Sequence, residues 1–138
     1  MLGISDYGRW SLGPNRRIES WRDLDVWQEA HKLVLGVYEI ARQFPVDERF
    51  RLADQLCRAA ISIPSNIAEG KGRGSLKGYL QFLMVARGSV EEVKYQLLLA
   101  RDLGYIGEPP FQELAEGYER VGRMLNGLIK SLKSRHQN

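Results

Sequence analysis

The sequence predicts an all-α protein whose four helices form one antiparallel up-down-up-down bundle. Apolar residues recur at intervals of three and four in four stretches of the chain, which is the pattern of helices that bury one face. No stretch alternates between apolar and polar residues for long enough to predict a strand. The connections between the four stretches are short, so we expect consecutive helices to run in opposite directions.

Three regions follow from the same pattern. Residues 1–20 are basic and interrupted by glycine and proline, which predicts a flexible arm. Residues 21–134 contain the bundle, and residues 135–138 are expected to form a disordered tail. Because the sequence shows neither a signal peptide nor an apolar run of membrane-spanning length, we expect a cytoplasmic protein with no membrane partner.

An aspartate is expected at the start of each of the first two helices, and a proline lies inside the second. The first is expected to begin after Asp23, whose side chain can accept a hydrogen bond from the first turn, and to end at Phe44. Asp47 can cap the second helix in the same way. Pro64 lies inside this second stretch, where it lacks an amide donor and clashes with the preceding turn. The sequence therefore predicts a second helix that is kinked or briefly broken at Pro64 and continues to Glu69.

The third helix carries more apolar residues than one buried face needs. It is expected to begin after Ser75 and to end near Leu103, followed by Gly104 in a left-handed conformation. Because it is too apolar for the outer layer of a monomer, we expect it to bury a second face against another copy of the chain. The residues beyond its core stripe are Phe82, Met84, Val85, Leu98 and Leu99.

The fourth helix divides into an acidic half and a basic half. It is expected to open at Pro109 and Pro110 and to run to about Lys133. Residues 120–135 contain bases and no acid, whereas the first half of the helix is rich in glutamate. This distribution can compensate the helix dipole, or it can form a surface that attracts a polyanion. Both interpretations stay open, because the net charge of the chain is only +3.

A glycine-rich segment, residues 70–75, separates the second and third helices. It matches neither the GxGxxG pattern nor the Walker pattern, and a helix rather than a strand is expected before it. One interpretation is a flexible turn. The other is a site at the start of the third helix that holds a backbone phosphate without hydrolysing it, formed by Lys71, Arg73 and Lys77.

The sequence lacks the residue patterns of enzymes, and we expect neither catalysis nor a cofactor. His31 and His136 lack the glutamate three residues earlier that bundle metal sites use, so we expect no metal site. Cys57 falls among apolar positions of the second helix, which indicates a packed thiol rather than a nucleophile. The Gly-x-Ser-x-Gly pattern of a nucleophilic serine does not occur.

One segment of the sequence carries a resemblance to a known family. This signature reads Ser62-Ile63-Pro64-Ser65-Asn66-Ile67-Ala68-Glu69-Gly70, followed by Gly72-Arg73. Softer matches along residues 21–133 include Leu24-Asp25-Val26-Trp27, Gly88-Ser89 and Leu103-Gly104-Tyr105-Ile106. In these residues the chain resembles the four-helix-bundle proteins first noticed as reading frames inside intervening sequences of bacterial 23S ribosomal RNA genes. It is similar, more distantly, to accessory proteins of diversity-generating retroelements.

The resemblance implies a ring-shaped homo-oligomer, a pentamer of antiparallel four-helix protomers, with no catalytic residues. The retroelement relatives act as basic scaffolds that bind nucleic acid and a reverse transcriptase. We interpret the signature as structural, since a proline bends the helix and neighbouring side chains can satisfy the backbone groups that it frees. The residues concerned are Ser62, Pro64, Ser65, Asn66, Glu69 and Gly70.

Two functional hypotheses result. The first is a non-catalytic, oligomeric bundle that binds RNA or other nucleic acid through its phosphates. The second is a protein-binding scaffold or adaptor, for example for a reverse transcriptase, with no direct nucleic-acid role. Under the first hypothesis the expected contacts are Lys71, Arg73, Lys77, Arg120, Arg123, Lys130 and Lys133.

Overall fold

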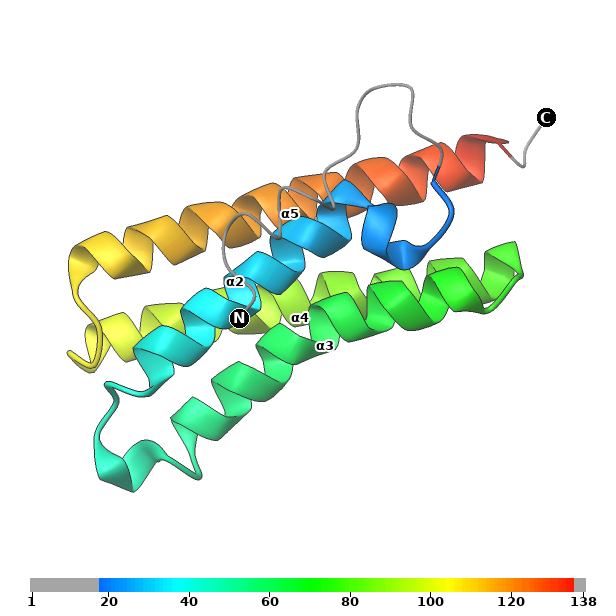
Figure 1. Cartoon of the computed structure of the whole chain (residues 1–138). Coiled ribbons are helices and arrows are strands. Elements are labelled where there is room, and N and C mark those ends of the chain that lie inside the picture. The colour runs from blue at the N-terminus through cyan, green and yellow to red at the C-terminus, as the bar shows by residue number, and fades with distance from the viewer. Residues whose placement is uncertain (1–17, 136–138) are drawn as a thin grey trace.

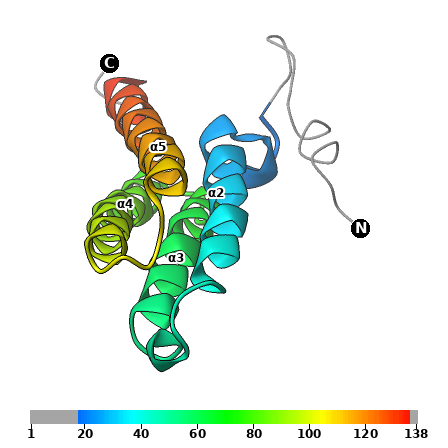
Figure 2. The same ribbon diagram turned by 90° about the vertical axis from the view of Figure 1, so that its left-hand side faces the viewer.

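The computed structural model describes residues 18–135, which contain four α-helices, two short 3-10 helices and no strand. The α-helices are α2 (Asp25–Ala41), α3 (Leu52–Gly72), α4 (Leu76–Asp102) and α5 (Glu108–Arg135). Each runs opposite to the one before it, and α5 returns beside α2 (Figure 1). Seen along the bundle, α2 and α4 lie on opposite sides, with α3 and α5 between them (Figure 2). The predicted all-α four-helix bundle is confirmed.

The arm predicted over residues 1–20 and the tail predicted over residues 135–138 lie mostly outside the described residues. Where they overlap, the structure differs from the prediction, because Ser20 caps the first 3-10 helix and Arg135 is the last residue of α5. α5 begins at Glu108, and Pro109 and Pro110 occupy its first turn, where helical amides need no partner. Within residues 18–135, none of the helices is long and apolar enough to cross a membrane.

A single apolar core runs between the four helices. Leu56, Leu83 and Leu125, from α3, α4 and α5, are completely shielded from solvent. Truncating one such leucine typically costs about 2–5 kcal/mol of folding free energy. The spacing of apolar residues in the sequence also places Tyr38 and Phe50 on buried helix faces, but the structure exposes them, at 40% and 85%. Tyr38 lies at the edge of its stripe, and Phe50 lies before α3 begins.

The start of α2 differs from the prediction because Asp23 belongs to a different turn. Ser20 Oγ accepts a hydrogen bond from Arg22 N at 3.1 Å, and Asp23 Oδ2 accepts one from Ser20 N at 3.0 Å. These reciprocal bonds form a capping box around the 3-10 helix η1 (Trp21–Asp23). The residue that precedes α2 is therefore Leu24, which offers no side-chain bond. The prediction of Asp23 as the cap of this helix is wrong.

The α2–α3 connection is longer than predicted. α2 ends at Ala41, and a second 3-10 helix, η2 (Val46–Glu48), follows before α3 begins at Leu52. Glu48 rather than Asp47 bonds the first turn of α3, because its Oε1 accepts a hydrogen bond from Leu52 N at 3.3 Å. The predicted cap at Asp47 is wrong: the neighbouring residue makes the bond, and the helix begins four residues later than a cap at Asp47 implies.

Pro64 lies inside α3 without breaking it. The helix continues to Gly72, so the predicted end three residues earlier is wrong, and part of the glycine-rich segment forms its last turn. Pro64 deprives the Ala60 carbonyl of its usual donor. The side-chain bond nearby goes to another carbonyl: Asn66 Nδ2 donates to Ser62 O at 2.7 Å. The bend at Pro64 itself stays a prediction.

Both predicted ends of α4 are confirmed. Ser75 Oγ accepts a hydrogen bond from Gly78 N at 3.1 Å, which caps the first turn. Gly104 has a φ of +79°, in the left-handed region that glycine enters without strain. Beyond it, Tyr105 N donates to Ala100 O at 2.9 Å, the long bond of a Schellman motif.

The second apolar face predicted for α4 is confirmed in part. Val85 and Leu98 are exposed, and Met84 and Leu99 are half-buried. Phe82 instead faces α3, because a Cβ added at Gly70 would lie only 2.8 Å from its own Cβ. Val85 and Leu98 therefore face outward, whereas Met84 and Leu99 pack partly against the core. Burial of this face against another copy stays a prediction.

Candidate nucleic-acid interface

Two stretches of the chain that contain no acidic residue lie side by side in the bundle. Residues 70–90 form the end of α3 and the first half of α4, and residues 120–135 form the second half of α5. Because α4 and α5 are antiparallel neighbours, the two stretches meet at the same end of the molecule (Figure 1). Arg87 Nη1 donates a hydrogen bond to Asn126 Oδ1 across the junction, at 3.1 Å. This arrangement concentrates positive potential at one end.

A groove between α4 and α5 gathers bases from both stretches. Lys130 and Lys133 are exposed, and Ile129 is buried beneath them. The ion pairs within residues 18–135 involve neither of these lysines nor Arg87. We call this the basic groove, and its lining residues are Arg87, Asn126, Ile129, Lys130, Lys133 and Ser134.

A second hollow continues the basic surface around the end of the bundle. It lies where the α3–α4 connector approaches the last turns of α5, so that Lys71, Tyr79 and Leu132 share one depression. Lys71 Nζ stands over the Tyr79 ring, 5.7 Å from its centroid. Lys77, in the first turn of α4, is exposed beside it. The predicted bases Lys71, Lys77, Lys130 and Lys133 therefore belong to one end of the molecule, which we call the basic end.

Arg73 lies at the same end, but its charge is compensated. Its Nη2 forms an ion pair with Glu69 Oε2 at 2.9 Å, one turn earlier in α3. The guanidinium also stands over the Phe82 ring, 4.7 Å from the centroid. An exposed pair of this kind holds its partner weakly and breaks at small cost.

Arg120 and Arg123 are not brought to the basic groove. Arg120 Nη2 forms an ion pair with Glu29 Oε1 of α2 at 2.7 Å. Arg123 lines a mixed hollow in the middle of the α4–α5 junction, together with Lys94 and Glu119. The hydrogen bond to Glu119 raises the pKa of Lys94, and the same bond lowers the pKa of the Glu119 carboxyl. Two acids line this hollow beside its three bases, whereas no acid lines the basic groove.

Sequence reasoning missed Arg87 and Asn126. Both lie in the basic groove, and they are 39 positions apart in the chain. The acid-free stretch that begins at the glycine-rich segment extends past Arg87 to Val90, which is the signal that would have included it. Asn126 carries no charge, and only the register between α4 and α5 places it there.

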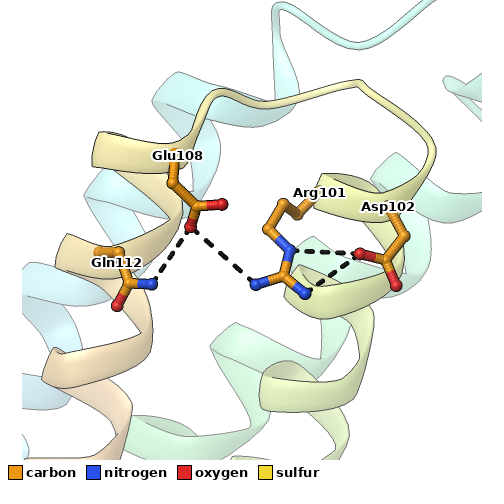
Figure 3. A network of polar contacts seen from close by, with 4 residues as sticks. All are labelled: Arg101, Asp102, Glu108 and Gln112. Atoms are coloured by element: carbon orange, nitrogen blue, oxygen red, sulfur yellow. Dashed lines mark hydrogen bonds and ion pairs between the residues drawn. The ribbon is translucent and has the colours of Figure 1, made fainter.

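The opposite end of the bundle carries the glutamate-rich start of α5, for which we call it the acidic end, and its α4–α5 turn is tied by a polar network. At the α4–α5 turn, Arg101 Nη2 pairs with Asp102 Oδ1 at 3.1 Å, and its Nη1 lies 3.9 Å from Glu108 Oε2 (Figure 3). Gln112 Nε2 donates to the same Glu108 oxygen at 3.1 Å. Arg101 also covers the Phe111 ring, 4.5 Å from its centroid. The charges at this turn are paired with one another, although both carboxylates stay exposed to solvent.

The two groups weighed as reactive residues have settings that disfavour reactivity. Burial, with the nearby Asp54 carboxylate, raises the pKa of the Cys57 thiol and keeps it protonated at neutral pH. His31 is half-buried, its ring stacks on Trp27 with centroids 5.1 Å apart, and burial lowers its pKa. In the part of the chain that the structure describes, no group of three or more His, Cys, Asp or Glu residues is placed to hold a metal ion.

Two residues of the signature, Ser62 and Gly70, contact α4, and Asn66 bonds to Ser62 within α3. The Ser62 and Ser89 hydroxyls share a hydrogen bond of 2.8 Å between the helices, and Asn66 Nδ2 donates to Ser62 Oγ at 3.0 Å. Gly70 permits the close approach to Phe82, because any side chain there would collide. These contacts support the structural interpretation of the signature.

Pro64 and Ser65 lie on a different side of α3. They line an apolar hollow between η1, α2 and α3, together with Trp21 and Trp27. The two indole rings are 4.8 Å apart and tilted by 59°. The signature thus contributes to both neighbours of α3, with α4 on one side and α2 on the other.

Comparison with known proteins agrees with this architecture. The chain is similar to a crystal structure of a protein of unknown function from the S23 ribosomal protein family of Bacteroides thetaiotaomicron VPI-5482, with a TM-score of 0.71. The two are 20% identical, over 76% of this chain and 95% of that one, and the likeness shows the fold. Comparison with curated proteins finds no match. A family model described as 23S rRNA-intervening sequence protein matches residues 22–127. The chain therefore belongs to the family of 23S rRNA-intervening sequence proteins.

Proposed function

We propose that this chain acts in the cytoplasm as a non-catalytic, oligomeric helical bundle that binds RNA or other nucleic acid through phosphate contacts. One observation carries the proposal: two acid-free stretches lie side by side and place Arg87, Lys130 and Lys133 around one groove. Lys71 and Lys77 extend the same basic end around the bundle. The family's association with ribosomal RNA genes supports RNA as the polyanion.

The chemistry of these residues favours contacts to phosphate over contacts to bases. Lysine ammonium groups act as point charges toward phosphate oxygens, and such contacts position a protein without reading sequence. Each neutralised phosphate releases counterions, so affinity falls steeply as salt rises. With about five contacts per protomer, affinity should fall about 10²–10³-fold between 50 and 200 mM salt. Assembly would repeat the basic end in every copy and strengthen binding to a long RNA.

Fluorescence anisotropy with a labelled RNA hairpin tests the proposal. Neutralising the basic groove should weaken binding at least about tenfold at low salt, and the slope of log affinity against log salt should become shallower by about 0.9 per lost contact. The test variant replaces three bases with glutamine: Arg87→Gln, Lys130→Gln and Lys133→Gln.

A matched control removes the same charge elsewhere. Lys32, Arg51 and Arg58 are exposed bases away from the basic end, and their replacement by glutamine should change affinity by less than about twofold. Equal losses in the two triple variants would mean that only net charge matters and would remove the groove from the proposal. Binding that is absent at 20 mM salt, or that does not respond to salt, would remove nucleic acid altogether.

The second candidate, a protein-binding scaffold or adaptor, is supported by a different surface. The outward face of α4 exposes Val85 at 52% and Tyr95 at 61%. Apolar residues gathered on one face favour a protein partner over a nucleic acid. A partner such as a reverse transcriptase that stays bound in 1 M salt after nuclease treatment would favour this candidate. Loss of all partners under those conditions would favour the first.

A further inference from the structure

α2 and α3 leave a largely apolar groove along their junction, with arginines at one end. Two hollows follow each other there, one lined by Val34 and Ile61 and the next, one helical turn away, by Tyr38 and Cys57. Tyr38 is 40% exposed and Ile61 is 38% exposed, although both are large apolar residues. We call this the α2–α3 groove and define it by Val34, Tyr38, Ala41, Cys57, Ile61 and Pro64.

The sequence produces this groove through a second stripe on each helix. Val34, Tyr38 and Ala41 recur at steps of four and three on α2, and Cys57, Ile61 and Pro64 recur at the same steps on α3. Positions spaced in this way share one helix face. Within these rows Tyr38 and Ile61 are exposed, Ala41 and Cys57 are half-buried, and Val34 and Pro64 are buried. The buried members therefore form the floor of the seam between the two helices, and the exposed members form its rim.

α4 presents a matching apolar surface on another side of the bundle. Its outward face carries Val85, Gly88, Tyr95 and Leu98, again at helical spacing, with Glu91 and Glu92 as the charges beside them. Figure 2 shows that α4 lies across the bundle from α2. One protomer therefore cannot bring its own α4 face into its own α2–α3 groove.

We propose that the outward face of α4 of one copy docks in the α2–α3 groove of the next copy. This inference rests on the oligomeric part of the proposed function and gives it an interface. An amphipathic helix that lays its apolar face in a groove between two helices is a common mode of recognition. Because the two surfaces differ and lie on different sides, the contact is heterologous, and repetition closes into a ring when the rotation per copy allows it.

Charge complementarity selects a second copy as the occupant. The hollow around Tyr38 is bordered by Arg42 and Arg49, and no acid lines it. The α4 face offers Glu91 and Glu92, both exposed. Glu91 also pairs with Lys94 at 3.1 Å on its own helix, and Arg42 pairs with Glu39 at 3.2 Å, but exposed pairs of this kind exchange partners at small cost. A helix docked in the groove would therefore place carboxylates near guanidinium groups, which fixes orientation more than it adds affinity.

The single cysteine of the chain makes the proposal directly testable. Cys57 lies in the α2–α3 groove, so a crosslink from it reports what occupies that groove. Two versions of the full chain are co-expressed with tags of different size and treated with a short bismaleimide. The reaction is run at pH 8, because the raised pKa of the Cys57 thiol slows its reaction at neutral pH. The first version is the natural chain. The second carries Cys57→Ser together with one new cysteine on the α4 face, in turn Val85→Cys, Tyr95→Cys or Leu98→Cys.

The expected result is a crosslinked pair that contains one chain of each version, from at least one of the three positions. A Glu116→Cys version with Cys57→Ser is the control, because Glu116 is exposed on α5 and belongs to neither surface. It should give no mixed pair. A chain that keeps Cys57 and adds the successful α4 cysteine should form a ladder whose largest member reports the number of copies in the assembly.

Each other outcome overturns the proposal in a distinguishable way. Pairs between two α4 cysteines would mean that α4 packs on α4, and pairs between two Cys57 residues would mean that groove packs on groove. An oligomer by light scattering with no mixed pair at any position would reject this docking and keep the oligomer. If the chain is a monomer at 100 μM, both the docking and the oligomer are rejected. Salt-dependent RNA binding is tested independently, by the anisotropy measurements.

Discussion

The two ends of the bundle are built from the same helices but differ in whether their charged side chains form ion pairs. At the α4–α5 turn, Arg101 contacts Asp102, Glu108 and the Phe111 ring, so the charged groups satisfy one another. At the basic end, the lysines of the groove form no ion pair within the described residues. A charge that is already paired contributes to holding a turn, whereas a charge without a partner is available to a ligand. The contrast separates structural polar residues from candidate binding residues.

The largest effect should come from the core that both ends share. Leu83 is fully buried, and Leu83→Asp would place a carboxylate there without a partner, at a cost of about 4 kcal/mol or more. That cost approaches the total stability of a typical domain, about 5–15 kcal/mol. We expect loss of cooperative folding in thermal melts followed by circular dichroism. Gln81→Asp, an exposed change two residues earlier, should melt almost as the natural chain does. A well-folded Leu83→Asp protein would show that α4 faces another way.

Two glycines near the end of α3 test helix packing and backbone entropy separately. A Cβ at Gly70 would meet Phe82 at 2.8 Å, whereas a Cβ at Gly72 would have no neighbour within 4 Å. We expect Gly70→Ala to lower the free energy of unfolding by about 1–3 kcal/mol, because α3 and α4 must separate. Gly72→Ala, in the last turn of α3, should raise it by about 0.5–1 kcal/mol. Urea unfolding measures both, and similar values for the two variants would contradict the close packing of α3 on α4.

Neutralising the acidic end should change RNA binding only at low salt. Glu116 and Lys130 are 14 residues apart on α5, which corresponds to about 21 Å. The screening length is about 30 Å at 10 mM salt and about 8 Å at 150 mM. The double variant Glu113→Gln with Glu116→Gln should therefore bind RNA a few-fold tighter at 10 mM salt and with nearly unchanged affinity at 150 mM. A large gain at 150 mM would mean that the RNA also touches the acidic end.

The smallest effect concerns the hydrogen bond that links the two turns of the acidic end. Tyr105 Oη donates to Glu48 Oε2 at 2.7 Å, and this bond lowers the pKa of the Glu48 carboxyl. A lowered carboxyl pKa adds stability above the usual value of 4.5, and that stability is lost as pH falls through the folded pKa. Tyr105→Phe should therefore lower Tm slightly at pH 7 and by less at pH 3. An equal loss at both pH values would mean that the hydroxyl acts through packing alone.

The helices were predictable from the sequence because apolar periodicity is local, and their ends were less so. Asp23 looks like a cap for α2, yet its carboxylate bonds back to Ser20, and Glu48 takes the role expected of Asp47. In the first case the aspartate serves the turn before the helix, and in the second a neighbouring carboxylate reaches the helix instead. Sequence spacing alone does not decide which side chain bonds to the helix, because the outcome depends on the path of the chain before the helix.

The candidate site was predictable where basic residues follow one another along the chain without an acid between them. Lys130 and Lys133 could be named because no acid interrupts their stretch. Arg120, in the same stretch, pairs with Glu29, 91 positions earlier, and Arg87 joins the groove through a contact over 39 positions. Contacts over such separations depend on which helices become neighbours and in which register.

The hydrogen bond between Ser62 and Ser89 carries a consequence for how this bundle finds its alignment. Stripes of leucine, isoleucine and valine pack similarly after a register shift of one turn, about 5.4 Å. Apolar contacts alone therefore discriminate poorly between neighbouring registers. A hydroxyl pair meeting at 2.8 Å is satisfied in one alignment only, and the bare backbone at Gly70 fits the Phe82 side chain in that same alignment. The signature thereby fixes the register between α3 and α4. Without it, we expect the helices still to pack together, but in more than one register.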